Sequence, residues 1–176
     1  MNSVARRYAK AFFDASKEFD IEKAKSELKE LTAVFDETNL DYYFFSPLLD
    51  KTKKHALLNE VFKYNDFMPA TRKFMTLLID KKRIDLFPSI IEHFTDLYNK
   101  EKNILKVECT SARELDPKVM DQIIQKLQNT FKMNIIIDSK IDSSLIGGLT
   151  LRIGSRLYDF SIKNHLENIQ RRRQWH

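Results

Sequence analysis

The sequence predicts a mainly α-helical protein, with an N-terminal six-helix bundle followed by a small α+β domain that contains a β-hairpin. Over the first hundred residues apolar side chains recur every three or four positions, which is the spacing of one helix face. From Asn103 onward apolar and polar residues alternate in several runs, as they do in half-buried strands. All three glycines lie between Gly147 and Gly154. We therefore expect a helical domain over residues 1–104 and an α+β domain over residues 105–176.

Turn and cap residues divide the first domain into short helices. Ser3 is a suitable N-cap, because its hydroxyl can accept a backbone N–H of the first turn. Pro47 stops a helix, because the residue before a proline avoids the helical region. Pro69 suits the first turn of a helix, where no N–H is needed. The expected helices span residues 3–19, 21–35, 40–45, 50–62, 69–80 and 86–102.

The second domain alternates strands with helices. Leu105, Val107 and Cys109 alternate with polar residues in the clearest strand pattern, and Asp116 and Pro117 open a helix. The expected strands span residues 105–110, 134–138, 149–153 and 157–160, and the expected helices span residues 117–131 and 162–173.

The glycine cluster raises the question of a phosphate-binding loop. Such a loop leads into a helix N-terminus and, in its best-known form, ends in Lys followed by Ser or Thr. Here Gly147 and Gly148 precede an alternating strand, and Gly154 lies between two alternating runs. The glycines are expected to be structural: a bend or bulge entering the third strand, then a tight turn into the fourth.

Composition excludes several classes of protein. No window approaches the 18 or so uninterrupted apolar residues of a membrane span, so we expect any membrane association to be peripheral. The single Cys109 cannot form an intramolecular disulfide. The four histidines lie in no metal-ligand spacing, and no catalytic motif is present. We expect no catalytic residue, no metal, no cofactor and no small-molecule substrate, hence no enzyme.

The net charge of +5 is uneven, since residues 105–176 carry 12 basic against 8 acidic residues. Arg171 to Arg173 account for most of this excess. One interpretation is a nucleic-acid-binding regulator that uses these arginines. The other is a helix C-terminus, which favours cations for electrostatic reasons, and a run of three is short for a nucleic-acid patch.

Three stretches resemble one family. IDSSLIGGLTLRIGSRLYDFSIKNHLENI is similar to the C-terminal signature of the delta subunit of F-type ATP synthases, the oligomycin-sensitivity-conferring protein of mitochondria. VARRYAKAFFDAS resembles the family's first helix, and the segment from Leu77 to Asp116 resembles its central part. One departure is Lys82, where many members have a glycine. The signature residues here are Gly147, Gly148, Gly154, Asp159 and Ser161.

The resemblance implies a structural adaptor between the catalytic head and the outer stalk, so that proton-driven rotation is coupled to ATP synthesis. It implies two partners, the N-terminal helix of an alpha subunit and the C-terminal end of the b subunits, and no nucleic acid. It also implies attachment to the membrane only through the complex. The chain length, the lack of a presequence pattern and the Lys/Asn/Ile-rich composition favour the cytoplasmic face of a bacterial membrane over the matrix side of a mitochondrial one.

Two helices are apolar over a wide arc of roughly 200°, about twice what one core needs. From the residues alone, a central position in the bundle and a second binding strip explain this equally well. The resemblance favours a groove between helices 3–19 and 69–80 that holds the alpha-subunit helix. The residues expected to touch this helix are Ala5, Ala9, Phe12, Phe13, Phe74 and Leu78. The residues expected to touch the b subunits are Arg152, Arg156, Arg171, Arg172 and Arg173, and Asp159 and Ser161 are expected to cap the last helix.

Overall fold

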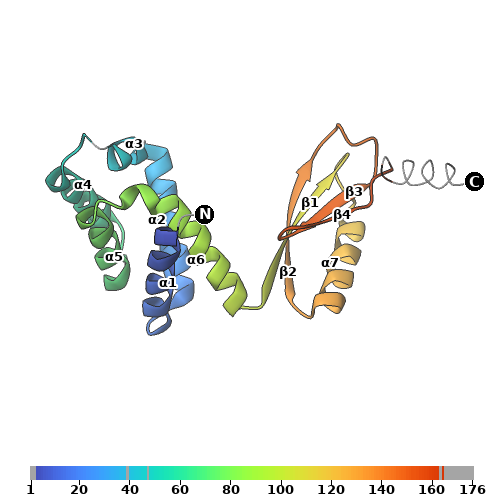
Figure 1. The fold of residues 1–176 in the computed structure, drawn as a ribbon, viewed down its shortest axis with the longest axis horizontal. Coiled ribbons are helices and arrows are strands. Elements are labelled where there is room, and N and C mark those ends of the chain that lie inside the picture. The colour runs from blue at the N-terminus through green and yellow to red at the C-terminus, as the bar shows by residue number, and fades with distance from the viewer. Residues whose placement is uncertain (1–2, 39, 47, 163, 165–176) are drawn as a thin grey trace, which may run out of the picture. The chain divides into compact units, whose positions relative to one another are not determined.

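The computed structural model describes residues 3–38, 40–46, 48–162 and 164, and it divides into two compact units between Tyr98 and Asn99 (Figure 1). The described residues are mostly helical and include one four-stranded sheet. The helices that begin in the first unit are α1 (Ser3–Lys17), α2 (Ile21–Thr38), α3 (Leu40–Phe45), α4 (Lys51–Tyr64), α5 (Pro69–Asp80), the 3₁₀ helix η1 (Ile84–Leu86) and α6 (Phe87–Glu101), and the last residues of α6 belong to the second unit. The remaining elements are β1 (Ile104–Ser111), α7 (Pro117–Phe131), β2 (Asn134–Ile141), β3 (Leu149–Ile153) and β4 (Arg156–Asp159).

Helix ends follow local chemistry. Asp50 caps α4, because its carboxyl oxygen accepts the N–H of Lys53 at 2.8 Å. Asp116 caps α7 through the N–H of Lys118, and Pro117 occupies the first turn. Helix α5 also begins with a proline, but its N-cap Met68 has no side-chain oxygen to offer.

Aromatic rings fill much of the first unit's core. Phe12 of α1 stacks on Phe74 of α5, with ring centroids 4.4 Å apart, and also meets Phe94 of α6 at 5.4 Å. Phe35 of α2 stacks on Phe44 of α3 at 4.8 Å. Stacked and tilted ring pairs at these distances contribute about 0.5–1.5 kcal/mol each beyond their burial. These contacts pack α1 against α5 and α6, and α2 against α3.

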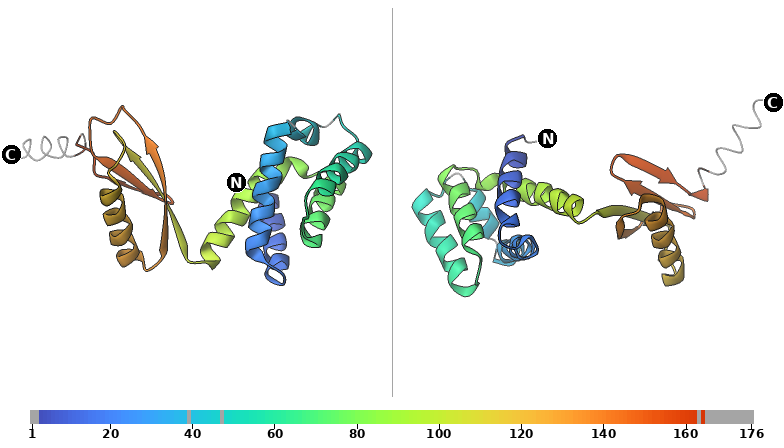
Figure 2. Two further views of the ribbon diagram at one scale, coloured as in Figure 1. Left: turned by 180° about the vertical axis from the view of Figure 1, so that it is seen from behind. Right: turned by 90° about the horizontal axis from the view of Figure 1, so that it is seen from below.

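The sheet of the second unit has the strand order β2-β1-β3-β4. Strands β1 and β2 are parallel, with Val107 opposite Ile137, and α7 is the crossover between them. Strand β3 is antiparallel to β1 and to β4. Helix α7 covers one face of this sheet, as two views show (Figures 1 and 2). The core beneath it centres on Val107, Cys109 and Leu151.

Several expectations need adjustment. The short helix η1 was not predicted, since three residues are too few to show a periodicity, and β2 runs to Ile141 instead of Asp138 because it pairs with β1 along its whole length. The expected last helix, 162–173, lies almost wholly outside the described residues. Within the described part of the chain, no helix is both long enough and apolar enough to cross a bilayer.

Candidate functional site

The six residues expected to bind the alpha subunit lie on α1 and α5, and all six are buried. Ala5, Ala9 and Leu78 have no exposed surface, and even Phe74 is only 7% exposed. All six belong to the first unit's hydrophobic core. Most of this set therefore holds the helices together and offers nothing to a partner in the structure as it stands.

An open apolar groove of about 350 Å³ nevertheless runs between the same two helices. Phe12 and Phe74 are common to the groove and to the expected set, and their stacked rings form part of its lining. The other lining residues are Tyr8, Ala11, Ala15, Phe19, Pro69, Ala70, Lys73 and Leu77. The groove is therefore lined by two residues of the expected set and by the neighbouring strip of each helix, whereas Ala5, Ala9, Phe13 and Leu78 are not part of its lining.

The wide apolar arc of α1 includes both the buried strip and the strip that lines the groove. Ala5 and Ala9 form one edge of the arc, and Tyr8, Ala11 and Ala15 form the other. We expected the Ala5 edge to bind because small residues permit close helix approach. That close approach is used within the bundle itself, where both alanines are fully buried. The exposed alanines, Ala11 and Ala15, lie in the groove.

The shape and chemistry of the groove suit an apolar helix face. Alanines leave room along its α1 side, while Phe19 and Leu77 remain 71% and 41% exposed. Large exposed apolar side chains grouped in one hollow are typical of interaction sites. The single charged side chain in the lining is that of Lys73.

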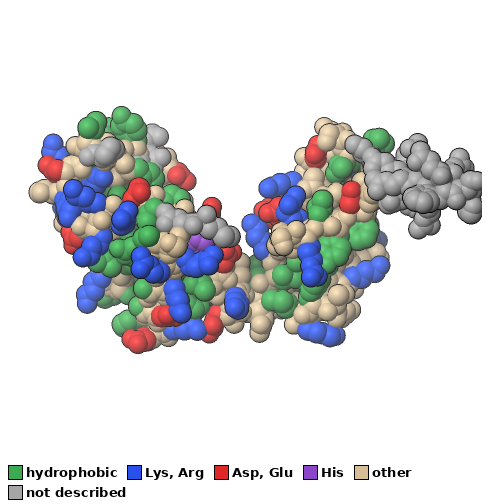
Figure 3. Space-filling model, in the orientation of Figure 1, with side chains coloured by type: hydrophobic (Ala, Val, Ile, Leu, Met, Phe, Trp, Pro, Cys, Tyr) green, Lys and Arg blue, Asp and Glu red, His purple; other side chains and the backbone are tan. Residues whose placement is uncertain are grey.

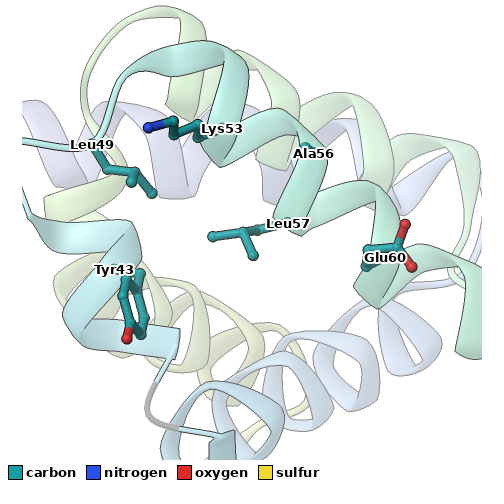
Figure 4. A pocket seen from close by; sticks show the side chains of 6 residues that line it. All are labelled: Tyr43, Leu49, Lys53, Ala56, Leu57 and Glu60. Carbon is teal, nitrogen blue, oxygen red and sulfur yellow. The ribbon is translucent and has the colours of Figure 1, made fainter.

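A second apolar hollow, of about 430 Å³, lies between α3 and α4. Figure 4 shows Tyr43 of α3, Leu49 of the connecting loop and Leu57 of α4 around it, with Lys53 and Glu60 at its edges. Figure 3 shows hydrophobic side chains gathered over α3 and the loop after it, where Tyr42 and Leu48 are exposed. This hollow provides a matched control for the groove between α1 and α5.

The arginines expected to bind the b subunits are only partly described. Arg152 lies on β3 opposite Glu108 of β1, and the two side chains approach to 3.9 Å. Both are about half exposed, so this pair contributes about 0–1 kcal/mol. Arg156 is exposed at the start of β4. Arg171, Arg172 and Arg173 lie outside the described residues.

The glycines shape the hairpin. The carbonyl of Gly147 accepts the N–H of Ile162, and Gly148 has φ +83° beside the backbone of Phe160. A Cβ on Gly148 would lie 2.3 Å from the Phe160 carbonyl oxygen. Gly154 has φ +58° in the two-residue turn between β3 and β4, and Ser155 does not share the positive φ, which is the pattern of a type II′ turn.

Polar contacts after β4 involve the two expected cap residues. The Asp159 carboxyl group accepts the N–H of Ser161 at 2.8 Å. The Ser161 hydroxyl accepts the N–H of Asn164 at 3.2 Å, a donor three residues further on, as a helix N-cap does. Asn164 in turn donates its amide to the Asp159 carbonyl.

Titratable groups form no reactive cluster in the part of the chain that the structure describes, where no three His, Cys, Asp or Glu residues are placed to hold a metal ion. Burial raises the pKa of the Cys109 thiol, which makes the reactive thiolate scarce. Desolvation lowers the pKa of Lys25, whose ammonium lies 3.8 Å from the ring centroid of Tyr98, and also that of Lys54. Hydrogen bonds from Ser144 lower the pKa of the exposed Asp142.

Comparison with known proteins identifies the family. The family model described as ATP synthase delta (OSCP) subunit matches residues 4–172. ATP synthase subunit delta of Carboxydothermus hydrogenoformans is 34% identical over 96% of both chains. The chloroplastic ATP synthase delta chain of Spinacia oleracea is 33% identical over 96% of this chain and 68% of its own.

The fold has a known counterpart as well. A chain in the cryo-EM structure of the Toxoplasma gondii mitochondrial ATP synthase hexamer superposes with a TM-score of 0.74 over 97% of both chains, at 24% identity. The chain therefore belongs to the ATP synthase delta (OSCP) subunit family, whose members are non-catalytic stator and adaptor subunits.

Proposed function

We propose that this chain ties the catalytic head of an F-type ATP synthase to the outer stalk, with one interface on each of its two units. In this proposal α1–α6 form a six-helix, head-binding domain, residues 1–104, that holds the N-terminal helix of an alpha subunit in the groove between α1 and α5. The α+β domain, residues 105–176, holds the C-terminal end of the b subunits. The observation that carries the proposal is the open apolar groove.

A helix is the partner that the groove fits best. Its α1 side presents Tyr8, Ala11 and Ala15 at intervals of three and four residues, which is a continuous strip along one helix face, and Phe19, just after the end of α1, extends the lining. A second amphipathic helix can lay its own apolar strip along it, in the helix-in-groove mode of recognition. Lys73 in the lining favours a partner with an acidic residue at that level.

The second interface is proposed from exposed positive charge. Arg156 is exposed at the hairpin turn, whereas Arg152 already faces Glu108. We therefore assign binding of the b subunits to Arg156, and to Arg171–Arg173 beyond the described residues, before Arg152. Such rim charges act on association rate and salt dependence more than on affinity.

Holding the head still is a mechanical task that needs two stable interfaces and no catalytic group. Interfaces between stable partners typically bury about 1,600 Å² in total. We place the protein at the cytoplasmic face of a bacterial membrane, attached through the complex. Its family membership favours this role over nucleic-acid binding.

The experiment compares Ala11→Asp with Ala56→Asp. Both alanines are exposed mid-helix residues that line apolar hollows, Ala11 in the groove between α1 and α5 and Ala56 in the hollow of Figure 4. A synthetic peptide of the alpha subunit's N-terminal helix is titrated into each protein by calorimetry. Ala11→Asp should weaken binding at least about tenfold, because a carboxylate is then desolvated against the peptide's apolar face. Ala56→Asp should bind like the parent.

Equal affinity of both variants and the parent would refute the groove assignment. Phe12→Asp and Leu78→Asp are unsuitable, since both side chains are buried and an introduced charge would damage the core. The second interface is tested in parallel by Arg156→Glu, which should slow association with a soluble fragment from the C-terminal end of a b subunit at low salt and leave the alpha peptide unaffected. An unchanged association rate would remove Arg156 from the interface.

A further inference from the structure

We propose that Glu27 is a positioning residue that fixes the N-terminal end of α5 and thereby sets the width of the partner-binding groove; this rests on the proposed function of that groove. Glu27 lies in the apolar stripe of α2, among Ala24, Leu28 and Leu31, which are all at most 1% exposed. Glu27 itself is only 3% exposed. Among the described residues, Glu27 is the only acidic or basic residue that is buried. The other buried polar residues are serines and one threonine.

A carboxyl group in a helical core is costly unless each oxygen has a hydrogen-bond partner. Both oxygens of Glu27 have one. Oε1 accepts the backbone N–H of Met68 at 2.7 Å, and Oε2 accepts the hydroxyl of Thr71. Both partners belong to the beginning of α5, more than 40 residues away along the chain. Glu27 therefore joins the middle of α2 to the first turn of α5.

The first turn of α5 lacks a cap of its own. Met68 is the N-cap residue and makes no side-chain cap hydrogen bond, and Pro69 has no N–H to donate. The free N–H groups of a helix start carry partial positive charge, which attracts an acidic group. Glu27 supplies from another helix the oxygen that the Glu or Gln at the third helical position of a capping box supplies to the N-cap N–H.

The other side of the same loop is held by Arg72. Its Nε donates to the carbonyl of Phe67 at 3.0 Å and its Nη2 to the carbonyl of Asn65 at 3.2 Å. Its guanidinium also lies 5.1 Å from the ring centroid of Phe62. Glu27 thus binds donors of the segment that starts α5, and Arg72 binds acceptors of the loop before it.

This anchoring reaches the groove through one helical turn. Thr71 faces the core and is fully buried, while Pro69, Ala70 and Lys73, on the adjoining face of the same turn, line the groove. If the start of α5 moved, that wall of the groove would move relative to α1. Helix-in-groove binding depends on apolar contact along the whole strip, so a shift of this wall reduces affinity.

The test compares Glu27→Ala with the conservative Glu27→Gln. Glutamine keeps an oxygen for Met68 and offers an N–H to the Thr71 hydroxyl, which can accept as well as donate. Alanine removes both contacts and leaves the Met68 N–H without its partner. Phe35→Leu is the control for general destabilisation, since its ring packs on Phe44 and Phe87, away from the two groove helices.

Two measurements are made on the full chain. The distance between α1 and α5 is measured by spin labels at Ala15→Cys and Leu77→Cys, both exposed groove residues, in a Cys109→Ala background. Affinity for the alpha-subunit peptide is measured on the unlabelled proteins. We expect Glu27→Ala to broaden or shift the distance distribution and to weaken binding of the peptide at least about tenfold. Glu27→Gln should restore the parental distance distribution and an affinity within about threefold of the parent.

Phe35→Leu should lower the melting temperature but keep the parental distances and affinity. The proposal is overturned if Glu27→Ala gives this same result. If Glu27→Ala does not fold, Thr71→Val, which removes one of the two contacts, takes its place with the same expected direction. The distance measurement needs no peptide. If the parent itself fails to bind the alpha-subunit peptide, the proposed function is wrong, but the distance between the spin labels on α1 and α5 still tests the role of Glu27.

Discussion

Lys82 stands where a glycine would be less strained, and replacing it should stabilise the protein. It follows the last turn of α5 with φ +53°, in the left-handed region. Its N–H donates to the carbonyl of Ile79 at 2.9 Å, and the N–H of Arg83 donates to Leu78 at 2.8 Å. These two bonds are the Schellman motif, which usually has glycine at the position of Lys82.

The magnitude follows from two opposing effects. A left-handed backbone costs a residue with a Cβ about 1–2 kcal/mol, which glycine avoids. Glycine also has more conformational freedom in the unfolded chain, which lowers the folding stability by about 0.4–1 kcal/mol and offsets part of this gain. The expected net stabilisation by Lys82→Gly is about 0.5–1 kcal/mol, or roughly 2–8 °C in melting temperature for a unit of this size.

Lys81→Gly is the matched control. Lys81 is the neighbouring exposed lysine, it has φ −84°, and its substitution removes the same charge. Glycine there brings only the entropic cost, so the protein should lose about 0.5–1 kcal/mol. The two variants should therefore move the urea midpoint of the helical circular dichroism signal in opposite directions.

Lys132 extends the test to the second unit, since it has φ +55° after α7 and its N–H donates to Gln128. If the units unfold in separate transitions, Lys82→Gly should raise one midpoint and Lys132→Gly the other. The reasoning is refuted if Lys82→Gly is no more stable than Lys81→Gly.

Two further predictions concern the second unit. Gly148→Ala should destabilise this unit by more than about 2 kcal/mol in urea unfolding, because the new Cβ would lie 2.3 Å from the Phe160 carbonyl oxygen. Gly154→Ala is the control, since no atom lies within 4 Å of its Cβ, and it should cost only the backbone strain of about 1–2 kcal/mol. Equal losses of stability in the two variants would contradict this. The Cys109 thiol should resist a thiol reagent at pH 8 in the folded protein and react rapidly in urea, because burial raises its pKa and shields it from the reagent. Fast labelling of the folded protein would show that strand β1 opens.

Much of the element order follows from local signals in the sequence. Pro47, Pro69 and the pair Asp116-Pro117 mark helix ends that depend on backbone chemistry alone, and α3 and α5 begin and end at the expected residues. The end of β2 was harder, because Ser139 and Lys140 break the apolar pattern. They belong to the strand because β1 lies beside them as a partner.

The groove shows where such reasoning stops. The sequence reports how wide the apolar arc of α1 is, but the choice between its Ala5 edge and its Ala11 edge depends on where α5 and α6 lie. The sequence also carries a signal for Glu27. It is an acidic residue within a regular apolar stripe, between Ala24 and Leu31, and such a residue is either exposed or satisfied by a specific partner.

The distribution of side-chain size around the groove explains why the bundle does not close it. Tyr8, Phe19 and Leu77 are large and only partly buried, whereas the centre of the α1 strip carries Ala11 and Ala15. Alanine cannot fill the space between α1 and α5, and no other described helix supplies residues to the lining. Larger residues at these two positions would bury the strip internally and should stabilise the free protein.

The small residues keep that apolar contact available for a partner, so a bulky Ala11→Leu variant should be more stable alone and bind the alpha-subunit peptide less tightly. Greater stability together with unchanged binding would show that the hollow is not the docking site.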